Sequence, residues 1–161
     1  MRHVAIAAIL ALTPSMPRLS GACSPVPESS PHVLDAAYAA DTTAPGAVTA
    51  SAVVEPPRSS DGGGCGATPL CGDGGPFLVV YAEATDDLTP VGRLGYRLEV
   101  VGGQAPAGFT LPTEALAPDG SELRIRIATT AAPFSVEVAI RAVDLNGNEG
   151  PASVITIAQE E

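Results

Sequence analysis

The chain has 161 residues and a formal net charge of −10 at pH 7, because it carries 18 Asp and Glu against 8 Arg and no Lys. Such an acidic chain is a poor partner for nucleic acid or for an anionic lipid surface, and neither is expected to bind it. The length provides for one small folded domain.

The first 22 residues are predicted to be a signal peptide. Arg2 and His3 precede an apolar run at residues 4–12, and residues 20–22 are the small side chains Ser, Gly and Ala. The run has about nine residues, against the roughly twenty that a membrane-spanning helix needs. The sequence therefore predicts export without a permanent membrane span.

Cys23 follows directly and resembles a lipid attachment site. Residues 19–23 read LSGAC, which is similar to the lipobox of bacterial lipoproteins, although Ser20 stands where that family prefers Leu. The resemblance implies that a diacylglycerol alkylates the Cys23 thiol and anchors the protein, and Ser24 resembles the outer-membrane class. Ordinary cleavage before Cys23 stays open as an alternative, and it would give a secreted or periplasmic protein.

Two further cysteines lie in a Gly-rich insertion at residues 55–76. Cys65 and Cys71 are predicted to form a disulfide, because cysteines oxidise outside the cytoplasm and lipidation of Cys23 accounts for the odd number. The bridge closes a loop of about seven residues, which stabilises by roughly 2 kcal/mol. Five intervening residues and no following histidine exclude a CxxC redox or zinc site. The insertion is expected opposite the N-terminal tether, either as a recognition loop or as a tolerated insertion.

Residues 23–43 are predicted to be a flexible tether that begins at the lipidated cysteine. Pro25, Pro27 and Pro31 are scattered among serines without apolar periodicity, a composition typical of linkers. The tether contains His32, the only histidine of the mature chain.

From residue 44 to residue 159, apolar residues alternate with polar ones, as in strands with one buried face. The pattern is clearest from Phe134 to Ala142, where every even position is apolar. Gly, Pro and Asp turns separate the segments, and no amphipathic helix interrupts them. The sequence therefore predicts an all-β fold, a two-sheet antiparallel sandwich. Its seven expected strands are 47–54, 77–84, 95–101, 109–111, 122–127, 134–143 and 152–158.

Three segments of this domain resemble bacterial fibronectin type III and related immunoglobulin-like modules. They read DTTAP at 41–45, YAEATDDLTP with LGYRLEV across 81–100, and AVDLNGNEGPAS at 142–153. The resemblance implies a seven-stranded antiparallel β-sandwich but no particular activity. It also implies that Tyr81 fills the position of a core Trp, that Val136 replaces a corner tyrosine, and that Tyr96 is the third-strand tyrosine.

No catalytic residues are predicted, and the chain is expected not to be an enzyme. Hydrolytic or transfer chemistry needs a base, a nucleophile and an orienting group, whereas the mature chain has one histidine in its tether, no lysine and no GxSxG. A carboxylate pair could act as in glycosidases, but the acidic residues lie in turns of a fold that seldom forms a cleft.

Acidic residues of the last hairpin and of the loop after the second strand suggest a Ca²⁺ site. In the resembling fold these loops share a pole with the start of the domain, and Ca²⁺ takes oxygen ligands from several loops. The other interpretation is turn chemistry, because tight turns favour Asp, Asn and Gly. Apart from Ca²⁺, no cofactor is expected. The candidate ligands are Asp41, Asp86, Asp87, Asp144, Asn146, Asn148 and Glu149.

The sequence thus favours a non-catalytic cell-envelope lipoprotein, a binding or spacer module held at the membrane by its lipid, whose protein or glycan ligand the residues do not identify. The runner-up is a secreted structural β-sandwich with a calcium-stabilised loop pole. A third hypothesis is an accessory module of an extracellular enzyme. That function would need an exposed aromatic platform, whereas Tyr38, Tyr81 and Tyr96 are assigned to tether or core.

Overall fold

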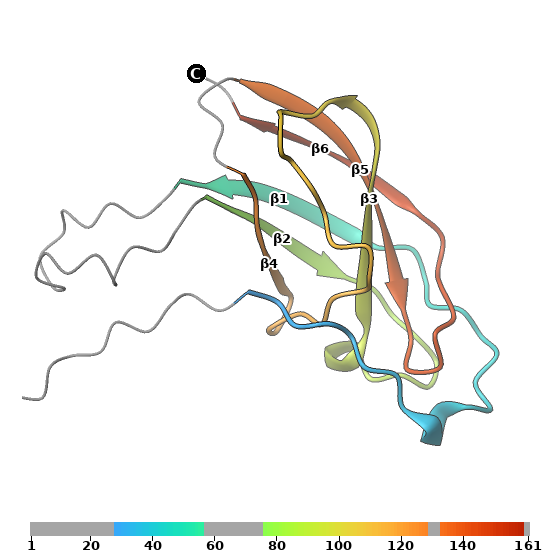
Figure 1. Cartoon of the computed structure of the whole chain (residues 1–161). Coiled ribbons are helices and arrows are strands. Elements are labelled where there is room, and N and C mark those ends of the chain that lie inside the picture. Colours follow the sequence, from blue (N-terminus) through green and yellow to red (C-terminus); the bar gives the residue numbers. More distant parts are fainter. Residues whose placement is uncertain (1–27, 57–75, 129–132, 160–161) are drawn as a thin grey trace, which may run out of the picture.

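The computed structural model describes residues 28–56, 76–128 and 133–159 (Figure 1). The predicted signal peptide, Cys23 and the predicted bridge between Cys65 and Cys71 lie outside the described residues. Within the described ranges, no helix is long and apolar enough to cross a membrane.

Among the described residues, six strands form two three-stranded antiparallel sheets, with the orders β1-β2-β4 and β3-β5-β6 (Figure 1). Two single turns of 3-10 helix, η1 and η3, lie in the connections of this described part. The all-β prediction is confirmed. The bounds are η1 Ala36–Tyr38, β1 Thr49–Glu55, β2 Phe77–Glu83, η3 Val91–Arg93, β3 Gly95–Gln104, β4 Glu122–Arg126, β5 Phe134–Val143 and β6 Ser153–Gln159.

The strand predicted at 109–111 does not form, so the described part of the chain has six strands where seven were expected. The Phe109 N–H donates to the Pro106 carbonyl at 3.0 Å, which closes a turn. Gly108 has a φ of +81°, a conformation that glycine adopts at low cost and that ends an extended segment. Phe109 still reaches the core, where its ring centroid lies 5.8 Å from that of Phe134.

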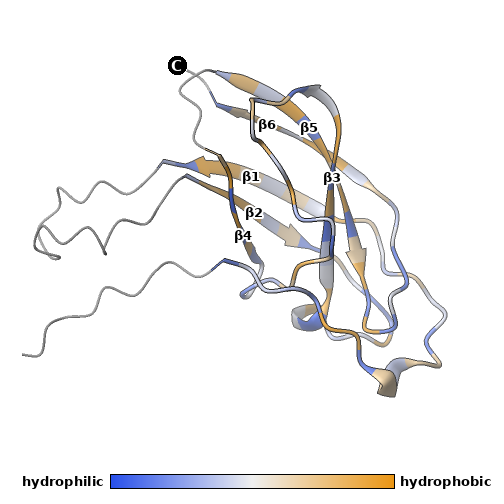
Figure 2. Cartoon of the chain, in the orientation of Figure 1, coloured by the Kyte–Doolittle hydropathy of each residue, from blue (hydrophilic) through white to orange (hydrophobic). Residues whose placement is uncertain are grey.

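One hydrophobic cluster takes side chains from both sheets, and Figure 2 shows apolar residues recurring along the strands. The even positions of β5 from Phe134 to Ala142, Val136 among them, all belong to this cluster, as the alternation predicts. In β6, Ile157 is 2% exposed whereas Val154 is 58% exposed. The odd positions of β6 therefore face the core.

Two tyrosines that the fibronectin type III resemblance singles out have different environments. Tyr96 of β3 is 1% exposed and belongs to the core cluster. Tyr81 of β2 is 43% exposed, so the expected core position is wrong. The core-facing residues of β2 are Leu78, Val80 and Ala82, and alternation along a strand puts Tyr81 on the opposite face.

Residues 28–41 form an N-terminal strap that lies along the domain. The strap pairs at Ser29 with Arg124 of β4, and Pro31 forms a bridge with Leu116. It then runs to the loops at the other end of the molecule (blue in Figure 1). The predicted flexible tether is therefore wrong for these residues. The composition did not reveal the strap, in part because its pairing with the domain at Ser29, Ser30, His32 and Asp35 uses backbone groups, which composition does not distinguish.

The two ends of the insertion lie at the same end of the molecule as the start of the strap. Glu55 pairs with Phe77 across the insertion, and Phe77 pairs with Arg126. Arg126 in turn forms an ion pair with Glu28 at 2.7 Å. The expectation that the insertion lies opposite the N-terminal segment is wrong, because the strap crosses the length of the domain before β1 begins.

Candidate metal centre

Three carboxylates converge at the end of the molecule opposite the insertion. Asp41 ends the strap, Asp86 lies in the loop between β2 and β3, and Asp144 follows β5 in the hairpin that leads to β6. One carboxylate oxygen of each residue lies within 4.8 Å of those of the other two. The structure thus brings three of the five acidic residues among the predicted ligands together in one cluster.

Asp144 is fully buried and organises the β5–β6 hairpin. Its Oδ1 accepts hydrogen bonds from the N–H groups of Asn146 and Asn148, both at 2.8 Å. Its Oδ2 accepts one from Asn148 Nδ2 at 2.6 Å. Gly147 has a φ of +93°, which suits a glycine at this turn. The DLNGN sequence therefore folds around the carboxylate and fixes its position.

Asp41 is 2% exposed and is held by neighbours from two segments. Its Oδ1 accepts a hydrogen bond from the Thr43 N–H at 3.0 Å. Its backbone carbonyl accepts from Asn146 Nδ2 at 2.7 Å and from Asn148 Nδ2 at 3.0 Å. Asp41 Oδ2, in contrast, is buried without a hydrogen-bond partner among the described residues. Burial of an unpartnered carboxylate oxygen costs free energy.

Asp86, like Asp41, has one carboxylate oxygen that accepts hydrogen bonds and one that does not. Oδ2 accepts hydrogen bonds from the N–H groups of Leu88 at 3.1 Å and Thr89 at 2.6 Å. Oδ1 is buried and has no partner within the described ranges. Thr89 Oγ1 accepts a hydrogen bond from the Leu145 N–H at 3.2 Å, which ties this loop to the β5–β6 hairpin.

The charge of the cluster favours a cation. Arg93, Arg97 and Arg124 form their ion pairs with other carboxylates. Three negative charges a few ångströms apart in a partly buried site repel one another. The donors are all oxygens, which hard cations prefer, and Ca²⁺ holds its ligands at about 2.3–2.6 Å, so that ligands of one ion lie within about 5 Å of one another. The cluster has the donor type and the dimensions for Ca²⁺.

The other four predicted ligands have different roles. Asp87 is exposed and does not belong to the cluster. Glu149 forms an ion pair with Arg97 at 2.9 Å. Asn146 and Asn148 use their amide nitrogens as hydrogen-bond donors, so they support the ligands.

His32 and Thr89 belong to the surroundings of the centre, and sequence reasoning missed both. His32 Nε2 lies 2.9 Å from the Asp144 carbonyl oxygen, and Thr89 is 2% exposed. A signal for Thr89 was present, because an Asp side chain often caps the backbone two or three residues later. His32 carried no such signal, since its neighbours have the composition of a linker.

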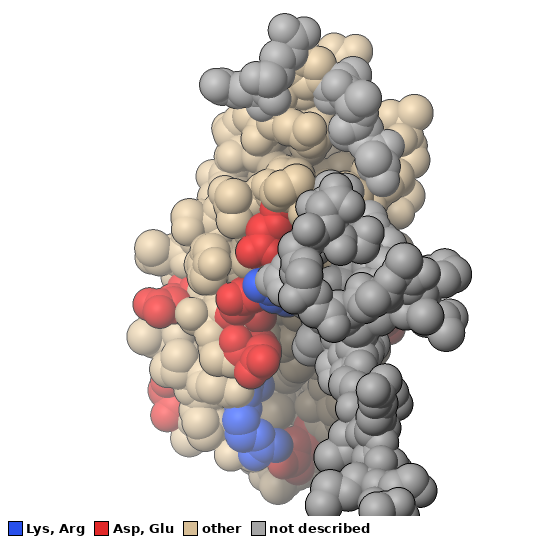
Figure 3. Space-filling view, turned by 90° about the vertical axis from the view of Figure 1, so that its left-hand side faces the viewer, with Lys and Arg blue, Asp and Glu red and all other residues tan. Residues whose placement is uncertain are grey.

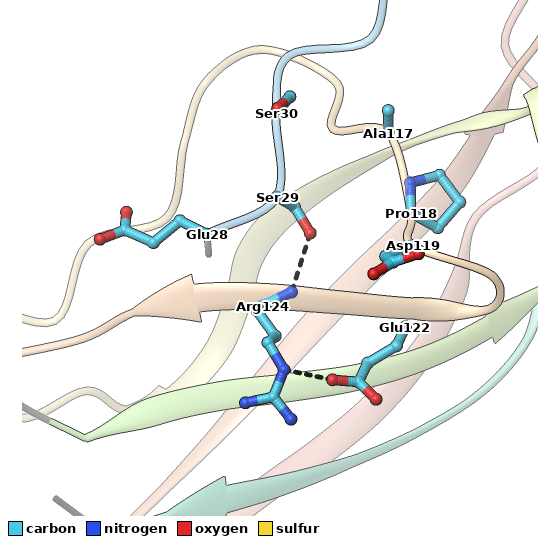
Figure 4. A pocket seen from close by; sticks show the side chains of 8 residues that line it. All are labelled: Glu28, Ser29, Ser30, Ala117, Pro118, Asp119, Glu122 and Arg124. Atoms are coloured by element: carbon cyan, nitrogen blue, oxygen red, sulfur yellow. Dashed lines mark hydrogen bonds and ion pairs between the residues drawn. The ribbon is translucent and has the colours of Figure 1, made fainter. Parts of the chain in front are cut away.

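A second candidate is a hollow of about 470 Å³ where the strap crosses β4 (Figure 4). Here Ser29 Oγ accepts a hydrogen bond from the Arg124 N–H at 2.9 Å, and Glu122 pairs with the Arg124 guanidinium. Burial alone would lower the pKa of Arg124, but hydrogen bonds to Glu55 and Glu122 raise it overall. Acidic and basic side chains lie next to one another in a column on this side of the molecule, with further acidic side chains apart from it (Figure 3). These polar groups are engaged with one another, so the metal centre is the stronger candidate.

Comparison of the chain with protein-family models, with curated proteins and with solved structures found no match. The fold and the candidate centre are therefore described from the geometry of this chain.

Proposed function

We propose that the protein is a non-catalytic β-sandwich module of the cell envelope whose loop pole is stabilised by a bound Ca²⁺ ion. The strand orders β1-β2-β4 and β3-β5-β6 correspond to strands A-B-E and C-F-G of an immunoglobulin-like sandwich without strand D. The core cluster shared by both sheets supports two facing layers. Both features agree with a fold of the fibronectin type III kind.

The calcium proposal is carried by two buried carboxylate oxygens without hydrogen-bond partners, Asp41 Oδ2 and Asp86 Oδ1. Buried polar atoms in folded proteins nearly always have a partner, and one cation would serve both. Asp144 adds a third carboxylate, which its hydrogen bonds already hold in place. A Ca²⁺ ion bound there would join the strap, the β2–β3 loop and the β5–β6 hairpin.

Thermal unfolding with and without calcium tests this proposal. Calcium at about 1 mM is about ten times a Kd of about 10⁻⁴ M, which stabilises by about 1.4 kcal/mol and raises the Tm of a small domain by about 5 °C. We expect calcium at about 1 mM to give such a rise relative to EGTA. Asp86→Asn should lose the rise, whereas Asp87→Asn, an exposed residue outside the cluster, should keep it. An unchanged Tm of the wild type at millimolar calcium would falsify the proposal.

The lipid proposed at Cys23 would give the module a defined orientation at the membrane, which we propose is the outer membrane. Glu28, the first residue of the strap, follows Cys23 by five positions, a reach of at most about 18 Å. The insertion end would then lie near the membrane and the metal centre would point away. We expect Cys23→Ala to move the protein out of the membrane fraction. If the variant stays there unchanged, the anchor is wrong and the secreted form of the module is favoured.

One observation favours an accessory module as a second candidate. Tyr81 is 43% exposed, and Val53, which is also exposed, lies two residues from the Tyr81 partner Ser51 on the neighbouring strand. This surface offers the start of an aromatic platform for a carbohydrate. In a pull-down on insoluble polysaccharides, the Tyr81→Ala variant should no longer bind, whereas the Val53→Ala variant should still bind. Equal retention of both variants would exclude this use of Tyr81.

A further inference from the structure

We infer that the calcium ion locks the N-terminal strap onto the domain, so that calcium sets the length of chain between the lipid anchor and the folded module. The inference rests on the proposed function, for both the ion and the anchor. It extends that function from stabilising loops to controlling how far the module stands from its membrane.

At its first end, the strap is held to the edge of β4 by surface contacts (Figure 4). The Ser29 N–H donates to the Arg124 carbonyl at 2.9 Å, and the Arg124 N–H donates to Ser29 Oγ at 2.9 Å. The Glu28 and Arg126 side chains pair at 2.7 Å but are 50% and 44% exposed. Exposed ion pairs contribute little stability, so this end of the strap is held weakly.

In its middle, the strap pairs with the segment that precedes β4. The Ala117 N–H donates to the Ser30 carbonyl at 2.8 Å, and the His32 N–H donates to the Ala115 carbonyl at 2.7 Å. Gly95 of β3 lies directly against the His32 ring, because a Cβ added to Gly95 would overlap it. A side chain at this position would push the strap away from the domain.

At its second end, the strap reaches the metal centre. His32 Nε2 lies 2.9 Å from the Asp144 carbonyl oxygen, and the Asp35 N–H donates to the Leu145 carbonyl at 2.8 Å. The strap ends in Asp41, whose carboxylate belongs to the cluster. A bound ion would therefore connect the last residue of the strap to the loops on which the strap lies.

The strap buries little of its own surface before it reaches Asp41. Residues 28–40 contain no fully buried residue, and Val33 and Leu34 are 75% and 57% exposed. Segments with few buried apolar contacts open at a low cost in free energy. Asp41 is buried, but without a cation the other two carboxylates repel its charge. Loss of the ion should therefore favour release of the strap.

Release would change the reach of the anchor. With the strap docked, five residues lead from Cys23 to Glu28, at most about 18 Å. With the strap free, eighteen residues lead from Cys23 to Asp41, at most about 65 Å. Extracellular calcium modules have dissociation constants of about 10⁻⁴–10⁻³ M, so modest depletion of calcium would lengthen the reach roughly threefold.

Hydrogen exchange of the mature protein tests the lock. In about 1 mM calcium we expect the backbone N–H groups of His32 and Asp35 to exchange at least about tenfold more slowly than in EGTA, because a docked segment exchanges only when it opens. Asp86→Asn changes a ligand outside the strap, and its strap amides should exchange in calcium as the wild type does in EGTA. Asp87→Asn should behave as the wild type.

A reciprocal variant leaves both the strap sequence and the ligands intact. Gly95→Ala should displace His32 and so disfavour docking of the strap. Coupling between two binding events is reciprocal. If calcium favours the docked strap about tenfold, loss of docking should weaken calcium affinity by the same factor, about tenfold. Isothermal titration with calcium measures this. Gly92→Ala is the matched control, because an added Cβ there meets nothing within 4 Å.

The outcomes separate the lock from the metal site. If calcium raises the Tm but the strap amides exchange equally fast with and without it, the lock is overturned and the calcium site stands. If calcium changes neither, both proposals fail. Should Gly95→Ala not fold, the comparison of Asp86→Asn with Asp87→Asn still decides.

Discussion

The two ends of the molecule hold their carboxylates in opposite ways. At the insertion end, Glu28, Glu55 and Glu122 pair with arginines of β4, and all of these side chains keep contact with water. At the loop end, Asp41 and Asp144 are 2% and 0% exposed. There, backbone and side-chain amide N–H groups of the loops donate hydrogen bonds to the two carboxylates.

This difference distinguishes solvated carboxylates, which form surface ion pairs, from buried carboxylates, which can bind a cation. Exposed ion pairs are solvated and typically contribute between 0 and about 1 kcal/mol. A buried carboxylate loses its water and must recover that free energy from hydrogen bonds or a cation. In a chain with a net charge of −10, the number of acidic residues says little, whereas burial without a basic partner marks the site.

The largest effect should come from Asp144→Ala at the loop end. The substitution removes three hydrogen bonds to a buried carboxylate. It leaves the N–H groups of Asn146 and Asn148 without that acceptor, whereas Asn148 Nδ2 keeps the Asp41 carbonyl. We expect a cost of about 4 kcal/mol. Urea unfolding in EGTA measures the loss without any contribution from calcium. Asp87→Ala, exposed in the neighbouring loop, should lie within about 0.5 kcal/mol of the wild type. A similar small loss for both variants would show that burial does not distinguish the two residues.

Tyr96 tests the effect of burial on a polar group that is uncharged at neutral pH. Burial raises the pKa of its phenol, and a hydrogen bond with the Ala84 backbone lowers it in part. Because the folded pKa lies above the unfolded value of about 10, this contribution is complete below pH 10 and is lost as pH rises through the folded pKa, by at most about 1.4 kcal/mol per pH unit. Urea unfolding between about pH 8 and pH 11 should show this fall.

Tyr96→Phe is the control for that titration. It should remove the alkaline slope and cost about 1 kcal/mol near pH 8, where the lost hydrogen bond is the main change. If wild type and variant lose stability equally above pH 10, the slope belongs to other groups.

Asp41→Asn should stabilise the protein in EGTA and destabilise it in calcium. In EGTA it removes one of three repelling charges, and the new amide can donate to a neighbouring carboxylate, so we expect a gain of about 1 kcal/mol. In calcium the same variant should be less stable than the wild type, because it has lost a charged ligand. Tm values of both proteins in EGTA and in calcium should therefore cross. A variant that is destabilised equally in both solutions would contradict the account of the cluster.

Strands could be predicted from the sequence where buried and exposed residues alternate. The prediction failed where the backbone conformation turns the chain out of the extended form. The even positions of β5 enter the core as the sequence pattern indicates. The segment around Phe109 has a suitable apolar residue, but Gly108 at φ +81° turns the chain. Hydropathy records that Phe109 is buried, and it does not record whether its backbone joins a sheet.

The candidate site was predictable to the level of loops and less so to the level of residues. Asp41, Asp86 and Asp144 lie together, as the resemblance led us to expect for the loops that carry them. Asp87 and Glu149 lie in the same loops, yet one residue of difference along a loop changes the direction of a side chain. The strap left no signal, because its pairing with the domain uses backbone groups that composition does not reveal.

The smallest effect should come from Glu122→Gln at the insertion end. Glu122 pairs with Arg124, whose guanidinium also contacts Glu55 at 3.0 Å, so the arginine keeps one carboxylate after the change. All three side chains are between 20% and 33% exposed, and water can solvate whatever the variant leaves free. We expect a loss of less than about 0.5 kcal/mol, which should shrink further in about 1 M salt. Urea unfolding at low and high salt measures it. A loss above about 2 kcal/mol would place this pair with the buried carboxylates of the loop end, and the contrast between the two ends would then rest on the cation alone.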